Sequence, residues 1–301
     1  MRKRRVWEEP FPLCPELVML GFDDVRSAIP LEEHRHERSF EFVYVEKGRA
    51  AWKIGRDTYE TLAGDVFHTR PEETHSGRFD VIEPCRLWWL ILRVPEGRGS
   101  RWLELPEAEA ELVLARLWTL PRMVTPDAPV LAIFRKLKEA LEAPKAWAGL
   151  EIRHAVLGLL LVLLREDKPL GRVEPGEPVI RELAGRLAEY PAWRPSVPEL
   201  ASLAGMSESH FYRQFHRVTG LSPMAYGERI RIEEACRRLQ HSLEPVTSMA
   251  LDLGFTSSQH FATVFRRVTG RSPREWRRLT AAGVLLPLEG EQLSGRPDGL
   301  G

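Results

Sequence analysis

The 301-residue chain has no asparagine, only three cysteines and no apolar run long enough to cross a membrane. Cys14, Cys85 and Cys236 are odd in number and widely spaced, which argues against a disulfide framework and against a cysteine-based zinc cluster. Their scarcity favours a reducing cytoplasm. The most apolar run, residues 155–164, has ten residues, whereas a membrane helix needs about 20. We therefore expect a cytoplasmic protein with no membrane partner.

The first ten residues also lack the pattern of a secretion signal. Residues 1–5 are basic, but Val6-Trp-Glu-Glu-Pro10 follows them where a signal peptide has an apolar segment. Residues 1–30 are interrupted by prolines and show no clear periodicity. We expect a frayed basic terminus here, with an arm that touches DNA or a partner as the alternative.

The net charge of zero hides a difference between the two ends of the chain. Residues 179–280 contain 15 Arg against 10 Asp and Glu, a net charge of +5, whereas residues 1–178 carry −3 and residues 281–301 carry −2. A basic segment behind a mildly acidic one indicates that only the C-terminal part meets a polyanion.

One segment occurs twice in this basic region. Residues 210–223, HFYRQFHRVTGLSP, return as residues 260–273, HFATVFRRVTGRSP, with nine of fourteen positions identical. Two copies cannot form a solenoid, which needs at least three repeats to bury a core. Two copies of one compact module explain the pattern better.

Each copy shows the signature of a helix-turn-helix. In the first, Ser196 and Glu199 form a capping-box pattern at the start of a helix that ends at Gly205. A second helix then begins at Ser207, with apolar residues at positions 211, 215 and 218. The second copy repeats this order around its own turn at Gly254. In such a motif the second helix enters the DNA major groove; the alternative is a solvated polar helix face.

The apolar stripes determine which side chains point outward. With about 100° per residue, polar side chains opposite the phenylalanines become the candidates for reading bases. They are Ser209, Tyr212, Arg213, His216, Ser258, Gln259, Thr263 and Arg266. Arg213 and Gln259 lead this set because arginine recognises guanine and glutamine recognises adenine. Candidates for phosphate contact are Ser207, Arg217, Ser257, Arg267 and Arg271.

Residues 34–94 show short alternating segments typical of a sandwich or barrel. Within them, His34-x-His36 is followed by Glu41, and His75 comes later in a Gly-x6-Pro-x3-His pattern. This arrangement resembles the two signature motifs of the cupin barrel, whose histidines and glutamate face one cavity. These four residues suit a divalent Zn, Fe, Ni or Mn ion, but many cupins keep such residues as polar groups of a pocket without metal. We predict an effector pocket lined by His34, His36, Glu41, Tyr44, Trp52, His75 and Trp89.

Between these two regions the pattern is helical. Apolar spacing predicts helices over residues 106–120, 130–141 and 150–164. We assign residues 1–100 to a cupin-like sensing barrel and residues 101–166 to a helical dimerisation or packing region. Residues 167–178 contain three prolines and two glycines and are expected to be a linker. The DNA-binding domain then spans residues 179–280 and a flexible tail spans residues 281–301.

Residues 179–280 resemble the DNA-binding domain of the AraC/XylS family, down to Gly254-Phe255 and Gly270-x-Ser-Pro-x-x-Trp-Arg277. The barrel resembles the sensor domain of carbon-source regulators in that family. The resemblance implies two helix-turn-helix units joined by a long helix over residues 224–241. It also implies double-stranded DNA, a small effector such as a sugar, a homodimer and RNA polymerase as partners. The expected function is a transcriptional activator with no required cofactor and no catalysis; a metal-dependent cupin enzyme or a metal sensor is the alternative.

Overall fold

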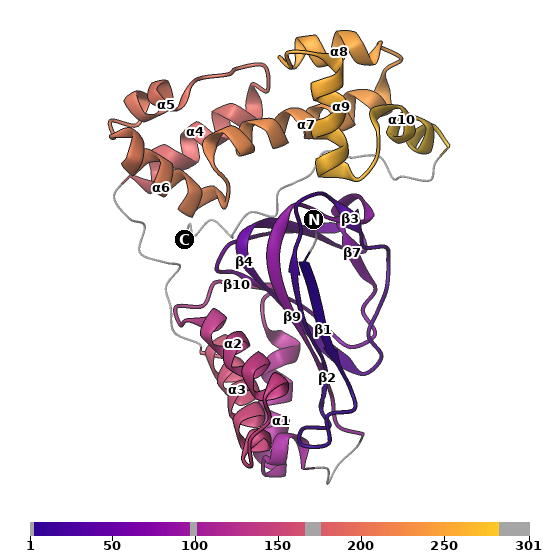
Figure 1. Cartoon of the computed structure of the whole chain (residues 1–301), viewed down its shortest axis with the longest axis vertical. Coiled ribbons are helices and arrows are strands. Elements are labelled where there is room, and N and C mark those ends of the chain that lie inside the picture. The colour runs from indigo at the N-terminus through magenta and orange to yellow at the C-terminus, as the bar shows by residue number, and fades with distance from the viewer. Residues whose placement is uncertain (1–2, 97–100, 166–175, 283–301) are drawn as a thin grey trace. The chain divides into compact units, whose positions relative to one another are not determined.

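The computed structural model describes residues 3–96, 101–165 and 176–282. Contacts between Cα atoms divide the chain into two units, each described by itself below (Figure 1). Unit 1 comprises residues 1–25, 32–76 and 85–168; unit 2 comprises residues 26–31, 77–84 and 169–301. Most of the linker predicted at residues 167–178 lies outside the described residues, as does the tail beyond residue 282.

The strands of unit 1 form one antiparallel sheet around a long central strand, β4 (Ser39–Ile54). The order along the sheet is β1 (Lys3–Glu8), β2 (Leu17–Asp24), β9 (Cys85–Arg93), β4, β6 (Val66–Thr69) and β10 (Met123–Val124). Two further strands, β5 (Asp57–Leu62) and β7 (His75–Gly77), also pair with β4. The strands predicted from alternating residues are therefore present.

Both faces of β4 are buried, because different layers cover them. Phe40 and Phe42 belong to the hydrophobic core that also contains helical residues such as Phe134 and Leu159. Glu41 alternates with them and is paired across the sheet with Thr69 and Ile91, on the opposite face. This alternation follows from the two-residue period of a strand.

Helices cover one face of the sheet, as Figure 1 shows for α2 and α3. The helices are α1 (Glu107–Thr119), α2 (Val130–Glu142) and α3 (Ala148–Leu163). A short 3-10 turn, η2 (Trp102–Glu104), precedes them. The three helices predicted from apolar spacing therefore exist with bounds shifted by one or two residues. Both the strands and these helices contribute to the hydrophobic core that contains Phe40 and Phe134.

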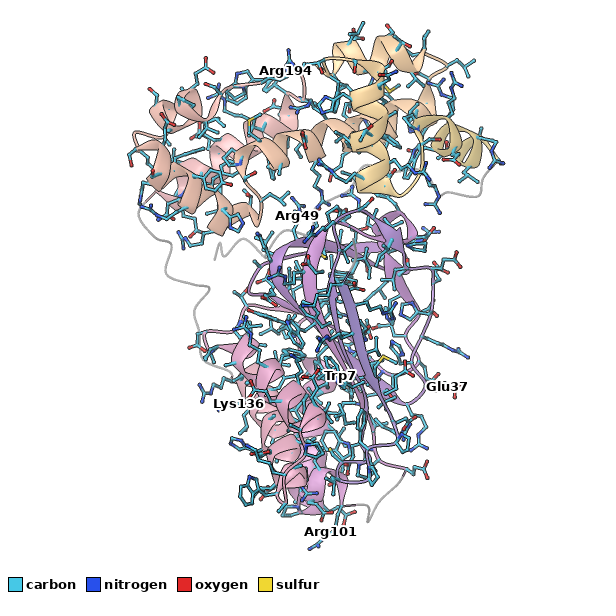
Figure 2. The ribbon with its side chains drawn as sticks, viewed as in Figure 1. Trp7, Glu37, Arg49, Arg101, Lys136 and Arg194 are labelled. Atoms are coloured by element: carbon cyan, nitrogen blue, oxygen red, sulfur yellow. The ribbon has the colours of Figure 1, made fainter. Side chains whose placement is uncertain are left out.

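The expectation of a frayed N-terminus is wrong. β1 pairs with β2 over six residues, from Lys3 opposite Asp24 to Glu8 opposite Met19. Trp7 of this strand packs against the core of unit 1 (Figure 2). Lys3, Arg4 and Arg5 therefore lie on an edge strand that is held by its ladder of hydrogen bonds and by this tryptophan.

Over residues 176–282 the secondary structure of unit 2 consists of helices. Its helices are α4 (Glu177–Glu189), α5 (Val197–Leu203), α6 (Glu208–Thr219), α7 (Pro223–His241), α8 (Val246–Asp252), α9 (Ser258–Thr269) and α10 (Pro273–Ala281). The pairs α5–α6 and α8–α9 are the two predicted helix-turn-helix motifs, and α7 is the long helix between them. Helix α4 begins inside the segment expected to be linker.

Each helix-turn-helix has a core of its own. Phe211 and Phe215 of α6 are fully buried in a core with α4 and α5. Phe261 and Phe265 of α9 are fully buried in a second core with α7, α8 and Trp276 of α10. The apolar stripes predicted from the repeat are confirmed.

Unit 2 also contains two short segments that come from much earlier in the chain. β3 (Ile29–Pro30) pairs with β8 (Val81–Ile82), and a 3-10 turn, η1 (Arg78–Asp80), precedes β8. We call residues 26–31 and 77–84 together the ribbon. Among the described residues no helix has both the length and the apolar character needed to cross a membrane.

Candidate functional site: two DNA-reading helices and a histidine cluster

The turns of the two helix-turn-helix motifs are built in the same way. Gly205 and Gly254 lie between the paired helices with φ of 64° and 75°, a left-handed conformation that side chains other than glycine rarely adopt. After each turn a serine begins the second helix: the hydroxyl of Ser207 accepts the amide of His210, and Ser257 accepts that of His260. These caps satisfy amides that would otherwise have no partner.

The residues shared by both copies form the scaffold. Thr219 donates its hydroxyl proton to the carbonyl of Phe215 at 2.8 Å, and Thr269 donates to that of Phe265 at 2.9 Å. In both copies a glycine with positive φ then ends the helix. Identity between the copies therefore reflects the requirements of packing and capping.

The outward faces of α6 and α9 carry the predicted base-reading residues. Ser209, Tyr212 and Arg213 are exposed on α6, and His216 is half-buried beside them. On α9 the exposed members are Gln259, Thr263 and Arg266, and Ser258 is half-buried. The Thr263 hydroxyl donates to the carbonyl of Gln259 within the helix.

The predicted phosphate contacts all have partners inside unit 2. The hydroxyls of Ser207 and Ser257 act as helix caps. Arg217 bonds Gln214, and Arg267 forms an ion pair with Glu228 at 2.6 Å. The Arg271 guanidinium donates to the carbonyl oxygen of Phe79 at 2.8 Å.

A loop arginine links the two motifs. Arg194 precedes α5 and donates a short hydrogen bond to the carbonyl of Gly254 in the turn of the second motif (Figure 2). Arg231 of α7 also stacks over the ring of Phe255, 5.4 Å from its centre. Sequence patterns gave no sign of either contact, because they join residues far apart in the chain.

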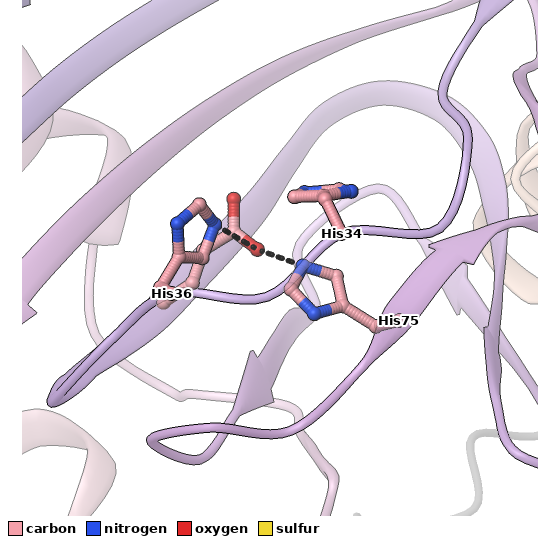
Figure 3. Close-up of side chains that lie close together, drawn as sticks. His34, His36 and His75 are labelled. Carbon is pink, nitrogen blue, oxygen red and sulfur yellow. Dashed lines mark ion pairs between the residues drawn. The ribbon is translucent and has the colours of Figure 1, made fainter.

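In unit 1, the His-x-His motif, Glu41 and His75 come together as predicted. Figure 3 shows the imidazoles of His34, His36 and His75 facing one another. Glu41 lies 2.9 Å from Nε2 of His75 and 3.7 Å from Nε2 of His36. His34 and His75 are also joined by an isolated β-bridge with backbone hydrogen bonds of 3.0 and 2.9 Å. We call these four residues the histidine cluster.

Backbone carbonyls orient two of these imidazoles. Nδ1 of His34 bonds the carbonyl of Glu32 at 2.8 Å, and Nδ1 of His75 bonds that of Glu73 at 2.9 Å. Such bonds place the proton on Nδ1 and leave Nε2 as a potential ligand atom, an arrangement common in metal-binding histidines. One ligand atom from each of the four residues lies within 4.8 Å of all the others.

The cluster perturbs the pKa values of its members. Burial alone raises the pKa of the Glu41 carboxyl, but hydrogen bonds from His36 and His75 outweigh burial and hold it well below its usual range. Burial lowers the pKa of His75, whereas its hydrogen bond to Glu41 raises it by more, so the net shift is upward. Burial lowers the pKa of His34. This set of groups fits a divalent metal ion: Glu41 is a carboxylate, His34 is a neutral imidazole, and His75 can exchange its Nε2 proton for the ion.

The other predicted pocket residues make packing contacts within unit 1. Tyr44 stacks on Phe134 of α2, with ring centres 5.9 Å apart, so it belongs to the helix-covered face. Trp52 stacks on Phe67 at 5.1 Å, and its indole N–H donates to Thr61.

Trp89 is packed into the sheet, where it lies over a glycine. A Cβ added at Gly21 would be 2.0 Å from the Trp89 ring, and the indole nitrogen donates to the sulfur of Met19. Tyr44 faces away from Glu41 because residues an odd number apart on a strand point to opposite faces. Tyr44 is therefore not a pocket residue. Trp89 pairs across the sheet with Val43, on the face that carries Glu41, so its place in the pocket, like that of Trp52, stays a prediction.

A β-rich part with a polar cluster, followed by two helix-turn-helix motifs, defines a DNA-binding transcriptional regulator with a ligand-binding domain. Two family models support this class: an AraC-like ligand binding domain matches residues 30–160, and a helix-turn-helix domain matches residues 200–279. Together they match more than half of the chain. The protein belongs to the AraC family of transcriptional regulators, and the fold class predicted from its sequence is confirmed.

Curated relatives match over most of their length. The chain is 28% identical over 257 residues to the HTH-type transcriptional activator RhaS of Klebsiella pneumoniae, covering 84% of this chain and 89% of RhaS. It is 24% identical over 259 residues to the MmsAB operon regulatory protein of Pseudomonas aeruginosa, covering 84% and 79%. Among solved structures, the DNA-binding domain of AdpA in complex with a target DNA is 31% identical, covering 35% of this chain and 94% of that one, with a TM-score of 0.33.

Proposed function

We propose that this protein activates transcription by reading a directional DNA site with α6 and α9. The observation that supports the proposal is the contrast between the two faces of these helices. Their buried faces share the same residues, whereas Arg213 on the exposed face of α6 corresponds to Thr263 on that of α9, and Ser209 to Gln259. Different side chains recognise different bases, so the two helices read different sequences.

The test is to select DNA fragments that the purified protein retains from a random pool. We expect two half-sites of different sequence whose centres lie about one helical turn apart, on the order of 10 base pairs. Transcription from a promoter carrying the selected site should rise when the protein and RNA polymerase are both present. Two identical half-sites, or retention without sequence preference, would contradict the proposal.

The histidine cluster is proposed to bind the effector. Imidazole nitrogens and a carboxylate hydrogen-bond well to a ligand with several hydroxyl groups, such as a sugar. Thermal shifts with a panel of sugars would identify the ligand. The shift should disappear in Glu41→Gln and persist in Glu60→Gln, which changes another carboxylate of unit 1.

A divalent metal ion is a second candidate for the cluster. It is favoured by the convergence of four ligand atoms within 4.8 Å and by the two carbonyls that orient His34 and His75. Bound there, an ion would draw an oxygen-containing effector to it or would itself be the signal. Calorimetric titration with Zn²⁺, Mn²⁺ and Ni²⁺ should give one site per chain.

The matched control for the metal site is a histidine outside the cluster. His75→Ala should weaken binding by at least about tenfold, since loss even of an outer partner of a metal ligand typically costs 10–100-fold. His154→Ala, an exposed histidine of α3, should leave it unchanged. Equal metal affinities in the two variants would show that the ion does not bind at the histidine cluster. Turnover of a substrate by the metal-loaded protein would favour the alternative that the protein is an enzyme.

We also propose that the protein is a homodimer formed through the helices of unit 1. Four large apolar side chains there are more than half exposed: Leu150 at 65%, Leu112 at 64%, Leu161 at 63% and Trp147 at 59%. Sedimentation should show a dimer that Leu161→Glu dissociates. Leu243→Glu, at a position 93% exposed in unit 2, should have no effect on it.

A further inference from the structure

The ribbon packs against the second helix-turn-helix within unit 2. The amide of Ala28 donates to the carbonyl of Arg267 at 2.7 Å, near the C-terminal end of α9. The ring of Phe79 meets Trp276 of α10 edge-on, with centres 4.9 Å apart. The ribbon therefore holds the end of α9 opposite to the one where Ser257 begins the helix, and it leaves Gln259 exposed.

Ion pairs anchor the ribbon to α7. Glu83 pairs with Arg229 at 2.6 Å, and both side chains are almost completely buried, at 5% and 4% exposure. Arg78 pairs with Glu233 at 3.1 Å, and Glu233 also holds Arg229 at 2.7 Å. Arg229 thus keeps a carboxylate partner if the ribbon leaves, so undocking does not strand a buried charge, which is the costly outcome for such pairs.

The contact that matters for DNA is made by Arg271. This residue lies two positions beyond the end of α9 and is half-buried, and its guanidinium donates to the carbonyl of Phe79. Arginines at this position of a recognition motif are suited to the phosphate backbone. While the ribbon is docked, Arg271 is turned to a carbonyl of its own chain.

The backbone of the ribbon is strained where it makes this contact. Phe79 and Asp80 have φ of 59° and 57°, a left-handed conformation that two consecutive residues other than glycine rarely keep unless surrounding contacts impose it. Gly77, just before them, lies very close to the backbone of Val81. A Cβ added at Gly77 would be 1.9 Å from the carbonyl oxygen of Val81. Strain of this kind is typical of segments that change conformation.

We propose that the ribbon is an autoinhibitory contact that withholds Arg271 from DNA. Its release frees this guanidinium for a phosphate and raises DNA affinity. The inference rests on the proposed function. The bridged residues of the histidine cluster lead straight into the ribbon, since His34 follows Leu31 by three residues and His75 precedes Gly77 by two. An occupant of the cluster that shifts this bridge therefore shifts the ribbon.

The test measures binding of the full chain to a random-sequence DNA duplex over a range of salt concentrations. Gly77→Ala should release the ribbon by steric exclusion and tighten binding about tenfold at low salt. The slope of log K against log salt should become steeper by about 0.9, the value for one additional phosphate contact. Gly158→Ala, a helical glycine with open space around it, is the control and should change neither quantity. In an Arg271→Ala background, Gly77→Ala should have no effect.

Hydrogen exchange at the Ala28 amide reports docking independently of DNA. The amide should be protected in the wild type and exchange faster in Gly77→Ala, and in Phe79→Ala if Gly77→Ala does not fold. Faster exchange with unchanged affinity and slope would overturn the proposal, as would an unprotected amide in the wild type or equal protection in all variants. Because random DNA is the probe, failure to find a specific site would count against the proposed function alone.

Discussion

His68 shows how burial controls a single titratable group. Its side chain is completely buried, and Nε2 bonds the carbonyl oxygens of Leu120 and Pro121 at 3.2 and 3.0 Å. Burial lowers the pKa of this imidazole to about 4, because a charged ring would lose its hydration. His68 is therefore neutral in the folded protein at ordinary pH, with its proton on Nε2.

This shift predicts a pH dependence of stability. The unfolded chain protonates His68 near pH 6.5, whereas the folded chain does so only near 4. The contribution of His68 to stability is therefore complete above about pH 6.5, declines by roughly 3 kcal/mol as the pH falls to about 4, and changes no further below that. Urea unfolding of unit 1 at several pH values should show this loss.

The comparison variant is His68→Asn, which keeps an N–H donor but does not titrate. Its stability should fall less than that of the wild type over the same pH range. His154→Asn, at an exposed position, should behave like the wild type. Parallel curves for the wild type and His68→Asn would show that this imidazole does not control the acid response.

At the scale of the element, α6 and α9 each present one leading base reader. Arg213→Ala should weaken binding to the selected site by about 1–3 kcal/mol and relax the preference at one base pair. Gln259→Ala should do the same at a different base pair in the other half-site. Competition with DNA fragments that differ by single base pairs measures both effects.

An arginine outside these helices provides the control for both substitutions. Arg237 lies on α7, is 58% exposed and pairs with Glu234, so Arg237→Ala should not alter the preference at any position. If Arg213→Ala reduced binding to random and selected DNA equally, Arg213 would be a phosphate contact.

At the scale of the whole molecule, the chain has separate hydrophobic cores. Phe134 lies in the core of unit 1 and Phe265 in a core of unit 2, and both are almost completely buried. Phe134→Ala should destabilise unit 1 by about 3–5 kcal/mol while the protein still retains DNA. Phe265→Ala should destabilise unit 2 by a similar amount and reduce DNA retention.

Calorimetry can separate these effects, because each substitution should move a different unfolding transition. Leu243→Ala, at a position 93% exposed and outside the proposed dimer interface, should move neither by more than about 0.5 kcal/mol. A single transition that shifts equally with both phenylalanine substitutions would show that the two units unfold together.

The sequence by itself determined the two helix-turn-helix motifs. Their signals are local: a serine cap, a stripe with helical period and a glycine turn all fall within about twenty residues, and each acts on its own segment. The histidine cluster was predictable for a similar reason. Three of its four residues lie on one short segment, and His75 stands in a pattern known from a resembling fold.

Only the tertiary structure decided how distant segments meet. A register shift between Val45 and Lys47 reverses the alternation along β4, so Trp52 shares a face with Phe67 and not with Tyr44. The place of residues 26–31 and 77–84 in unit 2 depends on Glu83 meeting Arg229, 146 positions away along the chain. Pairings between distant residues leave no periodic trace in the sequence, because they arise from packing after the local elements have formed.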